Sequence, residues 1–212
     1  MNLTIVLADA ELELAPEARN GRSPFAEVPV LDAYFHRDFL RSMPGGDRRG
    51  RPDIVHMALS LCQGSRLNRR GGLKVFVHTR EDKVISVDPG KRIPPNYIAF
   101  LEEMTILLGG EQVDGYSIAD MRLVTLIGVL RADMVIALTP DGEDKGIRRV
   151  LKERAPDNAV VIVGAFPRGD YASPVYDLAG VRISLGPDLL TVPTVISEVL
   201  SAMPLDDPKQ GA

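Results

Sequence analysis

The stretch "AVVIVGAFPRGD", residues 159–170, joins a run of apolar, mostly β-branched residues to a loop that holds two glycines and a proline. Such a run predicts a strand that is buried on both faces. The chain around it alternates strand-like runs, "DMVIAL" (133–138) and "VRISL" (181–185), with helix-like ones, "GEDKGIRRVLKERA" (142–155) and "TVPTVISEVLSAM" (191–203). Buried strands divided by helices indicate an α/β protein with a parallel sheet flanked by helices.

The N-terminal half mixes further strands and helices. A strand is predicted from the alternating apolar residues of "NLTIVLADA" (2–10), and a polar, proline-rich connection then reaches about Pro29. After it, "VLDAYFHRDFL" (30–40) predicts a helix. A β-hairpin is predicted from "GLKVFVHT" (72–79) and "KVISV" (83–87), which "REDK" separates.

Two helix boundaries are marked by proline and glycine. The segment "PPNYIAFLEEMTILLGG" (94–110) predicts a helix that starts after the prolines and stops at the glycines. At the other end of the chain, the tail "PLDDPKQGA" (204–212) is polar and is expected to fray.

Three loops follow the predicted strands of the C-terminal third, and ligands of parallel sheets bind at the carboxyl ends of strands. They are "LTP" (138–140), "GAFPRGD" (164–170) and "SLGPDLLT" (184–191). Gly164 and Gly169 lie five positions apart, which matches neither the G-x-G-x-x-G fingerprint of dinucleotide sites nor a phosphate loop ending in lysine. The loops therefore predict a binding cleft of another kind.

A cationic cluster, "RRGRPDIVH", begins at Arg48 and runs into an apolar helix-like segment. Pro52 suits the first helical position, and Asp53 suits the first turn because its charge complements the helix dipole. Arg48, Arg49 and Arg51 do not suit this place, because cations at a helix N-terminus are mildly unfavourable. We expect an anion from outside the chain to balance them.

Charge is distributed unevenly along the chain. The net charge is −4, yet residues 34–92 carry thirteen Lys and Arg against six Asp and Glu. A basic face on an acidic body is typical of a nucleic-acid binder that uses one surface. The alternative is an ordinary solvated surface with arginine-rich helix ends.

Length and composition narrow the class of protein. A chain of 212 residues with 45% hydrophobic content is long enough for one large domain with a real core. The single cysteine, Cys62, excludes an intrachain disulfide and is expected in the core, which is typical of a reducing cytosol. The chain has neither a long apolar stretch nor a signal-peptide pattern, so we expect a soluble, cytoplasmic protein that does not bind a membrane. His36, His56 and His78 lack metal-ligand spacing, so no metal is expected.

Four blocks carry a resemblance to a known family: "GRPDIVH", "LNRRGGLKVFVHTR", "RIPPNYIAF" and "GAFPRGD". In this order and spacing they resemble the archaeal and eukaryotic NEP/EMG family of methyltransferases of the SPOUT class, which act on nitrogen-1 of pseudouridine in small-subunit ribosomal RNA. The likeness runs from Leu3 to about Met203. It implies a single SPOUT domain over residues 1–212, with a trefoil-knotted parallel sheet. It also implies a sheet-and-helix RNA-binding extension at about residues 10–100.

The resemblance further implies a homodimer, small-subunit ribosomal RNA as substrate and S-adenosylmethionine as methyl donor. The physical reading of the three loops agrees, because an adenosine-type ligand needs backbone polar groups and apolar side chains around its ring. The residues that match the family's cofactor site are Thr139, Gly164, Gly169, Leu185, Gly186, Pro187, Asp188, Leu189 and Leu190.

The RNA-contacting residues of the family match the cationic cluster. The arginine matching Arg51 contacts RNA, the aspartate matching Asp53 holds that arginine by a charge-assisted hydrogen bond, and Arg92 matches a second RNA contact. The chain departs from the family at Pro95 and Ala99, where arginines are usual.

Neighbouring cations are candidates to compensate for that departure. Arg48 and Arg49 are predicted as additional RNA contacts, with Lys91 as a further one.

The methyl transfer requires that the proton on nitrogen-1 of pseudouridine be removed and that the base be extruded and aimed. Asp53 is the nearest candidate for the general base, but its pairing with Arg51 weakens it as a base, so we favour an orienting role. Two other functions stay open: an RNA-binding ribosome assembly factor with weak or no catalysis, and a Rossmann-type small-molecule enzyme, which the missing glycine fingerprint disfavours.

Overall fold

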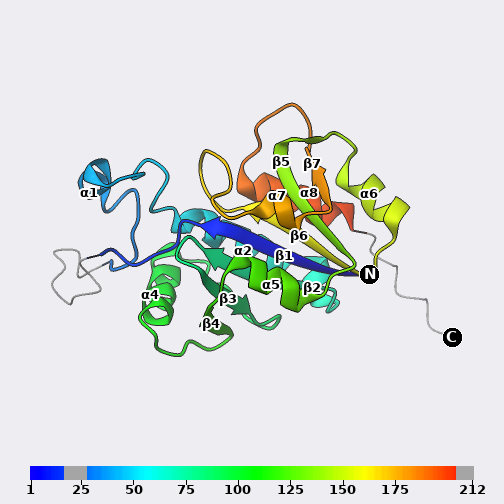
Figure 1. The fold of residues 1–212 in the computed structure, drawn as a ribbon. Helices are drawn as coiled ribbons and strands as arrows, with labels where there is room; N and C mark the ends of the chain where they lie inside the picture. The colour runs from blue at the N-terminus through cyan, green and yellow to red at the C-terminus, as the bar shows by residue number, and fades with distance from the viewer. Residues whose placement is uncertain (17–27, 204–212) are drawn as a thin grey trace.

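A computed structural model describes residues 1–16 and 28–203 of the chain. Its centre is a seven-stranded sheet in the order β4-β3-β2-β1-β6-β5-β7 (Figure 1). The strands are β1 (Asn2–Ala10), β2 (Leu73–Thr79), β3 (Lys83–Val87), β4 (Tyr116–Asp120), β5 (Met134–Glu143), β6 (Asn158–Gly164) and β7 (Val181–Ile183). The predicted tail 204–212 and most of the proline-rich connection before Pro29 lie outside the described residues.

The sheet is mixed rather than wholly parallel. From β2 through β1, β6 and β5 to β7 all neighbours are parallel, as the alternation of strands and helices predicts. The predicted hairpin of β2 and β3 is confirmed, and β4 pairs antiparallel to β3 at the edge. The sequence analysis missed β4, because its residues are half-buried or exposed and make no apolar run.

Helices cover both faces of the sheet, as predicted. In β1, Ile5 and Leu7 face one apolar core, whereas Val6 and Ala8 face the other, and all four are fully buried. The predicted strand at residues 2–10 is therefore confirmed, and as the central strand of the sheet it is buried on both faces. The first core includes residues of α2 (Pro52–Gly64), α4 (Tyr97–Leu108), α6 (Ile147–Arg154) and α8 (Val192–Ala202); the second includes residues of α5 (Leu123–Leu130) and α7 (Val175–Leu178).

Several helices begin later than their sequence patterns predict. The helix predicted from residue 30 starts only with α1 (Arg37–Ser42), because Val30 bridges to Leu14 and the Asp32 carboxylate accepts the backbone N–H groups of a turn. Helix α4, in contrast, starts after the prolines and stops at Gly109 as predicted, and the Asn96 side chain caps it by accepting two N–H groups of the first turn. In α6 the start follows Gly146, which has a φ of +67°.

Strand β5 runs further than predicted, so residues 138–140, predicted as the first ligand loop, are part of the strand. The predicted strand ends near Leu138, but β5 continues to Glu143 after a shift in its pairing with β7. Gly142 makes this possible, because a Cβ atom there would lie 2.4 Å from the carbonyl carbon of Ile183. The sequence analysis also missed α5, α7 and the short helix α3 (Arg66–Arg69).

The last helix, α8, packs within its own chain. Its residues Ile196, Val199 and Ala202 are buried in the core that α2 and α6 also line. The chain's own core therefore accounts for the burial of these apolar residues. No helix among residues 1–16 and 28–203 is long and apolar enough to cross a membrane.

Candidate active site

The carboxyl ends of the five parallel strands meet at one edge of the sheet. The second and third predicted ligand loops follow β6 and β7, whereas the residues of the first, 138–140, lie within β5. Thr139, in β5, is buried there. The hydroxyl of Tyr176 donates to the Asp170 carboxylate at 2.6 Å and lies 3.0 Å from Oγ1 of Thr139. Burial and the bond to Asp170 raise the pKa of Tyr176, which keeps its proton in place as a donor. Tyr176 thus links β5 to the loop that follows β6.

A second tyrosine, Tyr171, connects β5 and β6. The Tyr171 hydroxyl donates to the carbonyl oxygen of Leu138 at 2.8 Å and lies 3.3 Å from that of Ile162. Burial raises its pKa, so it stays neutral. One half-buried side chain therefore links β5 and β6.

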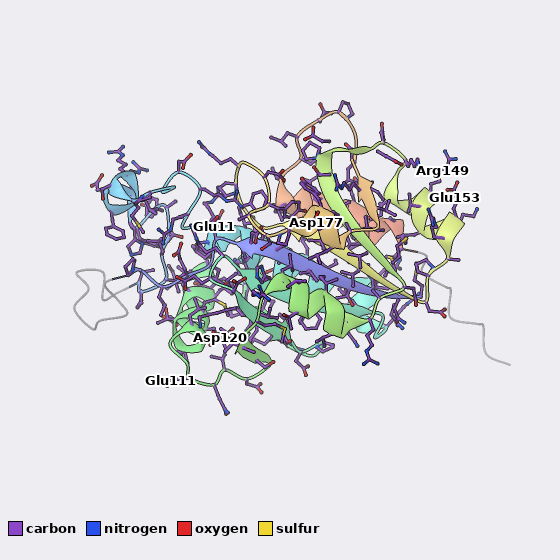
Figure 2. The ribbon with its side chains drawn as sticks, in the orientation of Figure 1. Glu11, Glu111, Asp120, Arg149, Glu153 and Asp177 are labelled. Atoms are coloured by element: carbon purple, nitrogen blue, oxygen red, sulfur yellow. The ribbon has the colours of Figure 1, made fainter. Side chains whose placement is uncertain are left out.

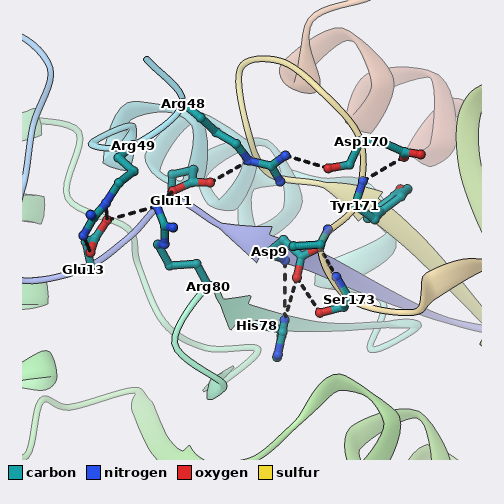
Figure 3. Close-up of polar contacts among 11 residues, drawn as sticks. Asp9, Glu11, Glu13, Arg48, Arg49, His78, Arg80, Asp170, Tyr171 and Ser173 are labelled. Atoms are coloured by element: carbon teal, nitrogen blue, oxygen red, sulfur yellow. Dashed lines mark hydrogen bonds and ion pairs between the residues drawn. The ribbon is translucent and has the colours of Figure 1, made fainter. Parts of the chain in front are cut away.

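The loop that follows β6 is also attached to β1 through Asp9. This buried residue has a φ of +51°, a left-handed conformation that is uncommon for aspartate. Its carboxylate accepts the backbone N–H groups of Ala172 and Ser173, at 2.8 and 3.0 Å, and the Ser173 hydroxyl at 2.6 Å (Figure 3). Because backbone strain is usually kept only where the surroundings enforce it, Asp9 is an anchor for this loop.

The three glycines predicted to bind cofactor are needed at their positions for different structural reasons. Gly169 has a φ of +79° and Gly186 a φ of +127°, so both adopt backbone conformations that side chains disfavour. Gly164 is needed for another reason: a Cβ atom there would lie 2.6 Å from the ring of Phe166. Gly164 makes room for an aromatic side chain of its own loop.

The third loop, after β7, begins with a turn in which the Ser184 hydroxyl donates to the carbonyl of Gly186 at 2.9 Å. Leu185 and Leu190 are half-buried, whereas Leu189 is 84% exposed. Pro187 and Asp188, the remaining predicted residues, are exposed. Apolar side chains and unhindered backbone around glycines match what an adenosine-type ligand requires, so the residues present fit such a group.

The predicted pairing of Arg51 with Asp53 is confirmed. Nε and Nη2 of Arg51 each donate to one oxygen of the Asp53 carboxylate, both at 2.8 Å. These hydrogen bonds raise the pKa of Arg51. Both side chains are about one-third exposed, at 33% and 35%, so the pair faces solvent at the start of α2.

Arg48 and Arg49 lie in a different environment. Nε of Arg48 donates to Glu11 at 2.8 Å, and Arg49 forms a two-pronged ion pair with Glu13. The side chains of Glu11 and Glu13 are only 2% and 1% exposed. Figure 2 shows Glu11 in the middle of the molecule, where the chain leaves β1. Hydrogen bonds to Glu13 raise the pKa of Arg49.

Arg80, which follows β2, completes the cluster: its Nη1 lies 2.9 Å from Glu11 and 3.7 Å from Glu13. We call these five residues, Glu11, Glu13, Arg48, Arg49 and Arg80, the Glu11/Glu13 network. The expectation that an anion from outside balances all three arginines of "RRGR" was wrong, because the chain's own carboxylates balance them.

Acids from outside residues 34–92 also neutralise other cations of the basic segment. Lys91 pairs with Glu103 at 2.7 Å, and Lys83 pairs with Asp120 at 2.7 Å. The local surplus of positive charge is therefore smaller in the folded protein than along the sequence.

The remaining predicted RNA contacts lie near the start of α4. Arg92 is exposed and lines a surface cavity of about 590 Å³. Pro95 is exposed and Ala99 half-buried. This region adjoins α2 through His56, whose Nε2 lies 2.7 Å from the carbonyl oxygen of Pro94 and whose ring lies 4.8 Å from that of Phe100.

The helix starts that carry Arg51 and Pro95 are therefore neighbours. His56 and His78 both make contacts within the fold, His78 lying between Asp9 and Asp82. No cluster of three or more potential metal ligands occurs in the part of the chain that the structure describes. Cys62 is buried as predicted, and burial raises the pKa of its thiol to about 12.

The sequence analysis missed Glu11 and Glu13 and the two residues that join the loops, Asp170 and Tyr176. The pattern "ELEL" after β1 was an available signal, since acidic residues two apart share one side of an extended chain. Asp170 and Tyr176 carry no comparable signal, because their roles depend on a contact between separate loops.

Comparison with known proteins decides the family. Residues 5–204 match the family described as EMG1/NEP1 methyltransferase. The chain belongs to this family. Proteins named ribosomal RNA small subunit methyltransferase Nep1 are similar to it: that of Methanothrix thermoacetophila is 38% identical, covering 93% of each chain, and that of Thermococcus kodakarensis is 36% identical, covering 93% of this chain and 96% of the relative.

The EMG1/NEP1 fold is also found in a solved structure similar to this one. The crystal structure of Archaeoglobus fulgidus Nep1 bound to S-adenosylhomocysteine has a TM-score of 0.78 and 29% sequence identity, and the match covers 95% of this chain and 97% of that one. The predicted family and the predicted α/β architecture with a helix-flanked sheet are both confirmed.

Proposed function

We propose that this EMG1/NEP1 chain is an S-adenosylmethionine-dependent methyltransferase that modifies nitrogen-1 of a pseudouridine in small-subunit ribosomal RNA during ribosome biogenesis. The names of its relatives support the RNA substrate, and the ligand of the A. fulgidus structure supports the cofactor. The observation that carries the proposal is within this chain: the ligand-type loops after β6 and β7 lie with Thr139 of β5 at one edge of the sheet, and the arginine-bearing loop before α2 contacts the loop after β6.

The cofactor is proposed to lie between the loops after β6 and β7 and the Thr139 segment of β5. It supplies a methyl group on a sulfonium centre. The chain supplies backbone polar groups around the glycines and apolar side chains for the adenosine ring. The proposed contacts are Thr139, Gly164, Gly169, Leu185, Gly186, Pro187, Asp188, Leu189 and Leu190.

The RNA is proposed to bind over the extension at about residues 10–100. Arg51 and Arg92 are its principal contacts, because both are solvent-accessible at neighbouring places. Arg48 and Arg49 are weaker candidates than the sequence indicated, since their guanidinium groups are engaged with buried carboxylates.

Asp53 orients Arg51 rather than accepting the proton of nitrogen-1. Each of its oxygens already accepts an N–H group of Arg51, so the carboxylate is engaged in holding the guanidinium. A guanidinium held in this fork has little rotational freedom left, so it meets an RNA phosphate or base with little further loss of entropy.

The single SPOUT domain over residues 1–212, the trefoil knot, the homodimer and the cytoplasmic location stay predictions. Light scattering at micromolar concentration tests the dimer, for which we expect about twice the chain mass of 23.1 kDa. A monomer that still methylates RNA contradicts it.

Two measurements test the proposed function. Calorimetry with S-adenosylhomocysteine is expected to show one site per chain. Methyl transfer is then expected to an RNA hairpin that contains pseudouridine and not to the same hairpin with uridine. Tight RNA binding without transfer would instead identify an assembly factor, and binding of neither ligand would contradict both functions.

A further inference from the structure

Arg48 makes a contact that its neighbour Arg49 does not. Besides its bond to Glu11, its Nη1 donates to the backbone carbonyl of Asp170 at 2.6 Å. Its guanidinium carbon also lies 3.9 Å from the centre of the Phe166 ring. Figure 3 shows the guanidinium between the end of β1 and the loop after β6. One side chain therefore joins three segments that are distant in sequence.

The loop from Gly164 to Asp170 is shaped around that arginine. Gly164 has no Cβ, which leaves room for the Phe166 ring on which Arg48 stacks. A Cβ atom at Gly169 would lie 3.2 Å from Nη1 of Arg48. Two of the loop residues predicted to bind cofactor thus owe their identity partly to the arginine and its stacking partner.

The contact extends across the proposed cofactor site. Arg48 holds the backbone of Asp170, and the Asp170 carboxylate accepts hydrogen bonds from the backbone N–H of Tyr171 and the hydroxyl of Tyr176. Tyr176 in turn lies against Thr139. A continuous set of polar contacts therefore runs from the arginine-bearing loop before α2 to β5.

Arg49 provides the comparison within the chain. It pairs with Glu13 as Arg48 pairs with Glu11, and both carboxylates are buried. Each hydrogen bond recorded for Arg49 side-chain nitrogens, among the described residues, goes to Glu13. A purely structural role in stabilising the end of β1 is therefore common to both arginines, whereas contact with the cofactor loop belongs to Arg48.

We propose that Arg48 is a positioning residue that holds the 164–170 loop in its cofactor-binding shape and couples that loop to the RNA-binding arginines beside it. The inference rests on the proposed function. It assigns Arg48 to the cofactor side of the site, where it acts through Phe166 and Asp170 rather than by touching RNA.

Matched lysine variants test this, because lysine keeps the positive charge beside the buried carboxylate but lacks the planar fork that reaches a second acceptor. Arg48→Lys is expected to weaken S-adenosylhomocysteine binding about tenfold in calorimetry, the loss that one charge-assisted hydrogen bond explains. Arg49→Lys is expected to leave that affinity unchanged within about twofold. Phe166→Leu, which removes the stacking partner and keeps the Glu11 pair, is expected to weaken binding in the same direction as Arg48→Lys.

Hydrogen exchange of the ligand-free proteins supplies a readout that does not need the cofactor. Backbone amides of residues 165–173 are expected to exchange faster in Arg48→Lys than in the parent and Arg49→Lys proteins. Unchanged exchange and unchanged affinity in Arg48→Lys overturn the inference alone, as does an equal loss of affinity in both lysine variants. Failure of the parent protein to bind S-adenosylhomocysteine overturns the proposed function as well, so the two failures are distinguishable.

Discussion

The Glu11/Glu13 network and the Arg51–Asp53 pair lie next to each other in the fold, yet their carboxylates are exposed to very different degrees. Glu11 and Glu13 are almost wholly buried, whereas Asp53 is 35% exposed. A buried carboxylate that loses its cation is strongly destabilised, whereas a partly exposed one is rehydrated. Two arginines only three positions apart therefore differ in role: Arg48 pairs with a buried carboxylate and stabilises the fold, whereas Arg51 stays accessible to a ligand.

The largest expected effect is on stability, from a substitution in the buried Glu11/Glu13 network. Arg49→Ala removes the two-pronged partner of Glu13 and is expected to lower the free energy of unfolding by about 3–5 kcal/mol. Urea denaturation followed by circular dichroism measures it. Arg149→Ala, which breaks the exposed pair with Glu153 at the periphery of the molecule (Figure 2), is the control and is expected to change stability little.

A double replacement sharpens the same prediction. Glu13→Leu combined with Arg49→Met removes both charges together and is expected to destabilise the protein less than Arg49→Ala alone. A double variant that is less stable than the single one would contradict the view that burial of an unpaired carboxylate is the cause.

The partly exposed Arg51–Asp53 pair predicts an effect on RNA binding instead. Arg51→Ala and Asp53→Ala are each expected to weaken RNA binding by about tenfold, while each lowers stability by about 1 kcal/mol or less. Because Asp53 acts through Arg51, the double variant is expected to lose little beyond the worse single one. Fluorescence anisotropy with a labelled hairpin and thermal melts on the same four proteins measure both quantities.

Two outcomes separate this from a helix-capping role for Asp53. Cofactor affinity is expected to stay unchanged in all three variants. A lower melting temperature of Asp53→Ala, with unchanged RNA affinity of the folded protein, retires the orienting role.

A smaller effect is expected in the salt dependence of RNA binding. If Arg51 neutralises a phosphate, Arg51→Ala lowers the slope of log affinity against log salt by about one, since roughly one condensed cation is released per phosphate contact. Pro95→Arg and Ala99→Arg are expected to steepen the slope, because these positions lie beside Arg51 at the start of α4. Titrations at three or more salt concentrations measure it, and a slope that no substitution moves argues against phosphate contacts here.

The smallest expected effect concerns Cys62, on the same helix as Asp53 but facing the core. Its thiol pKa, raised by burial to about 12, leaves almost no thiolate at pH 8, so a disulfide reagent is expected not to label the native protein. Labelling should be rapid in urea, where the pKa returns to its ordinary value. Arg51→Ala should keep Cys62 protected and Arg49→Ala should speed its labelling, because only the second opens the fold. Equal protection of Cys62 in Arg49→Ala and Arg51→Ala would contradict the view that only Arg49 is needed to keep the fold closed.

The sequence by itself determined the parts of this protein that depend on local pattern. Apolar runs located β1, β2, β3, β6 and β7, and the proline at the start of α2 located that helix, because side-chain spacing and backbone stereochemistry act over a few residues. The order and spacing of four motifs identified the family, and the resemblance to that family implied the pairing of Arg51 with Asp53 that the structure shows.

Only the tertiary structure decided which charged side chains form ion pairs and which residues are their partners. Glu11 meets Arg48 across 37 positions of sequence and Arg80 across 69, and Arg48 reaches Asp170 across 122. Such pairings depend on how parallel strands bring their carboxyl ends to one edge, which no local pattern specifies. The sequence therefore showed the arginines of "RRGR" as one cationic cluster, whereas the fold divides them between a buried network and a solvent-facing pair.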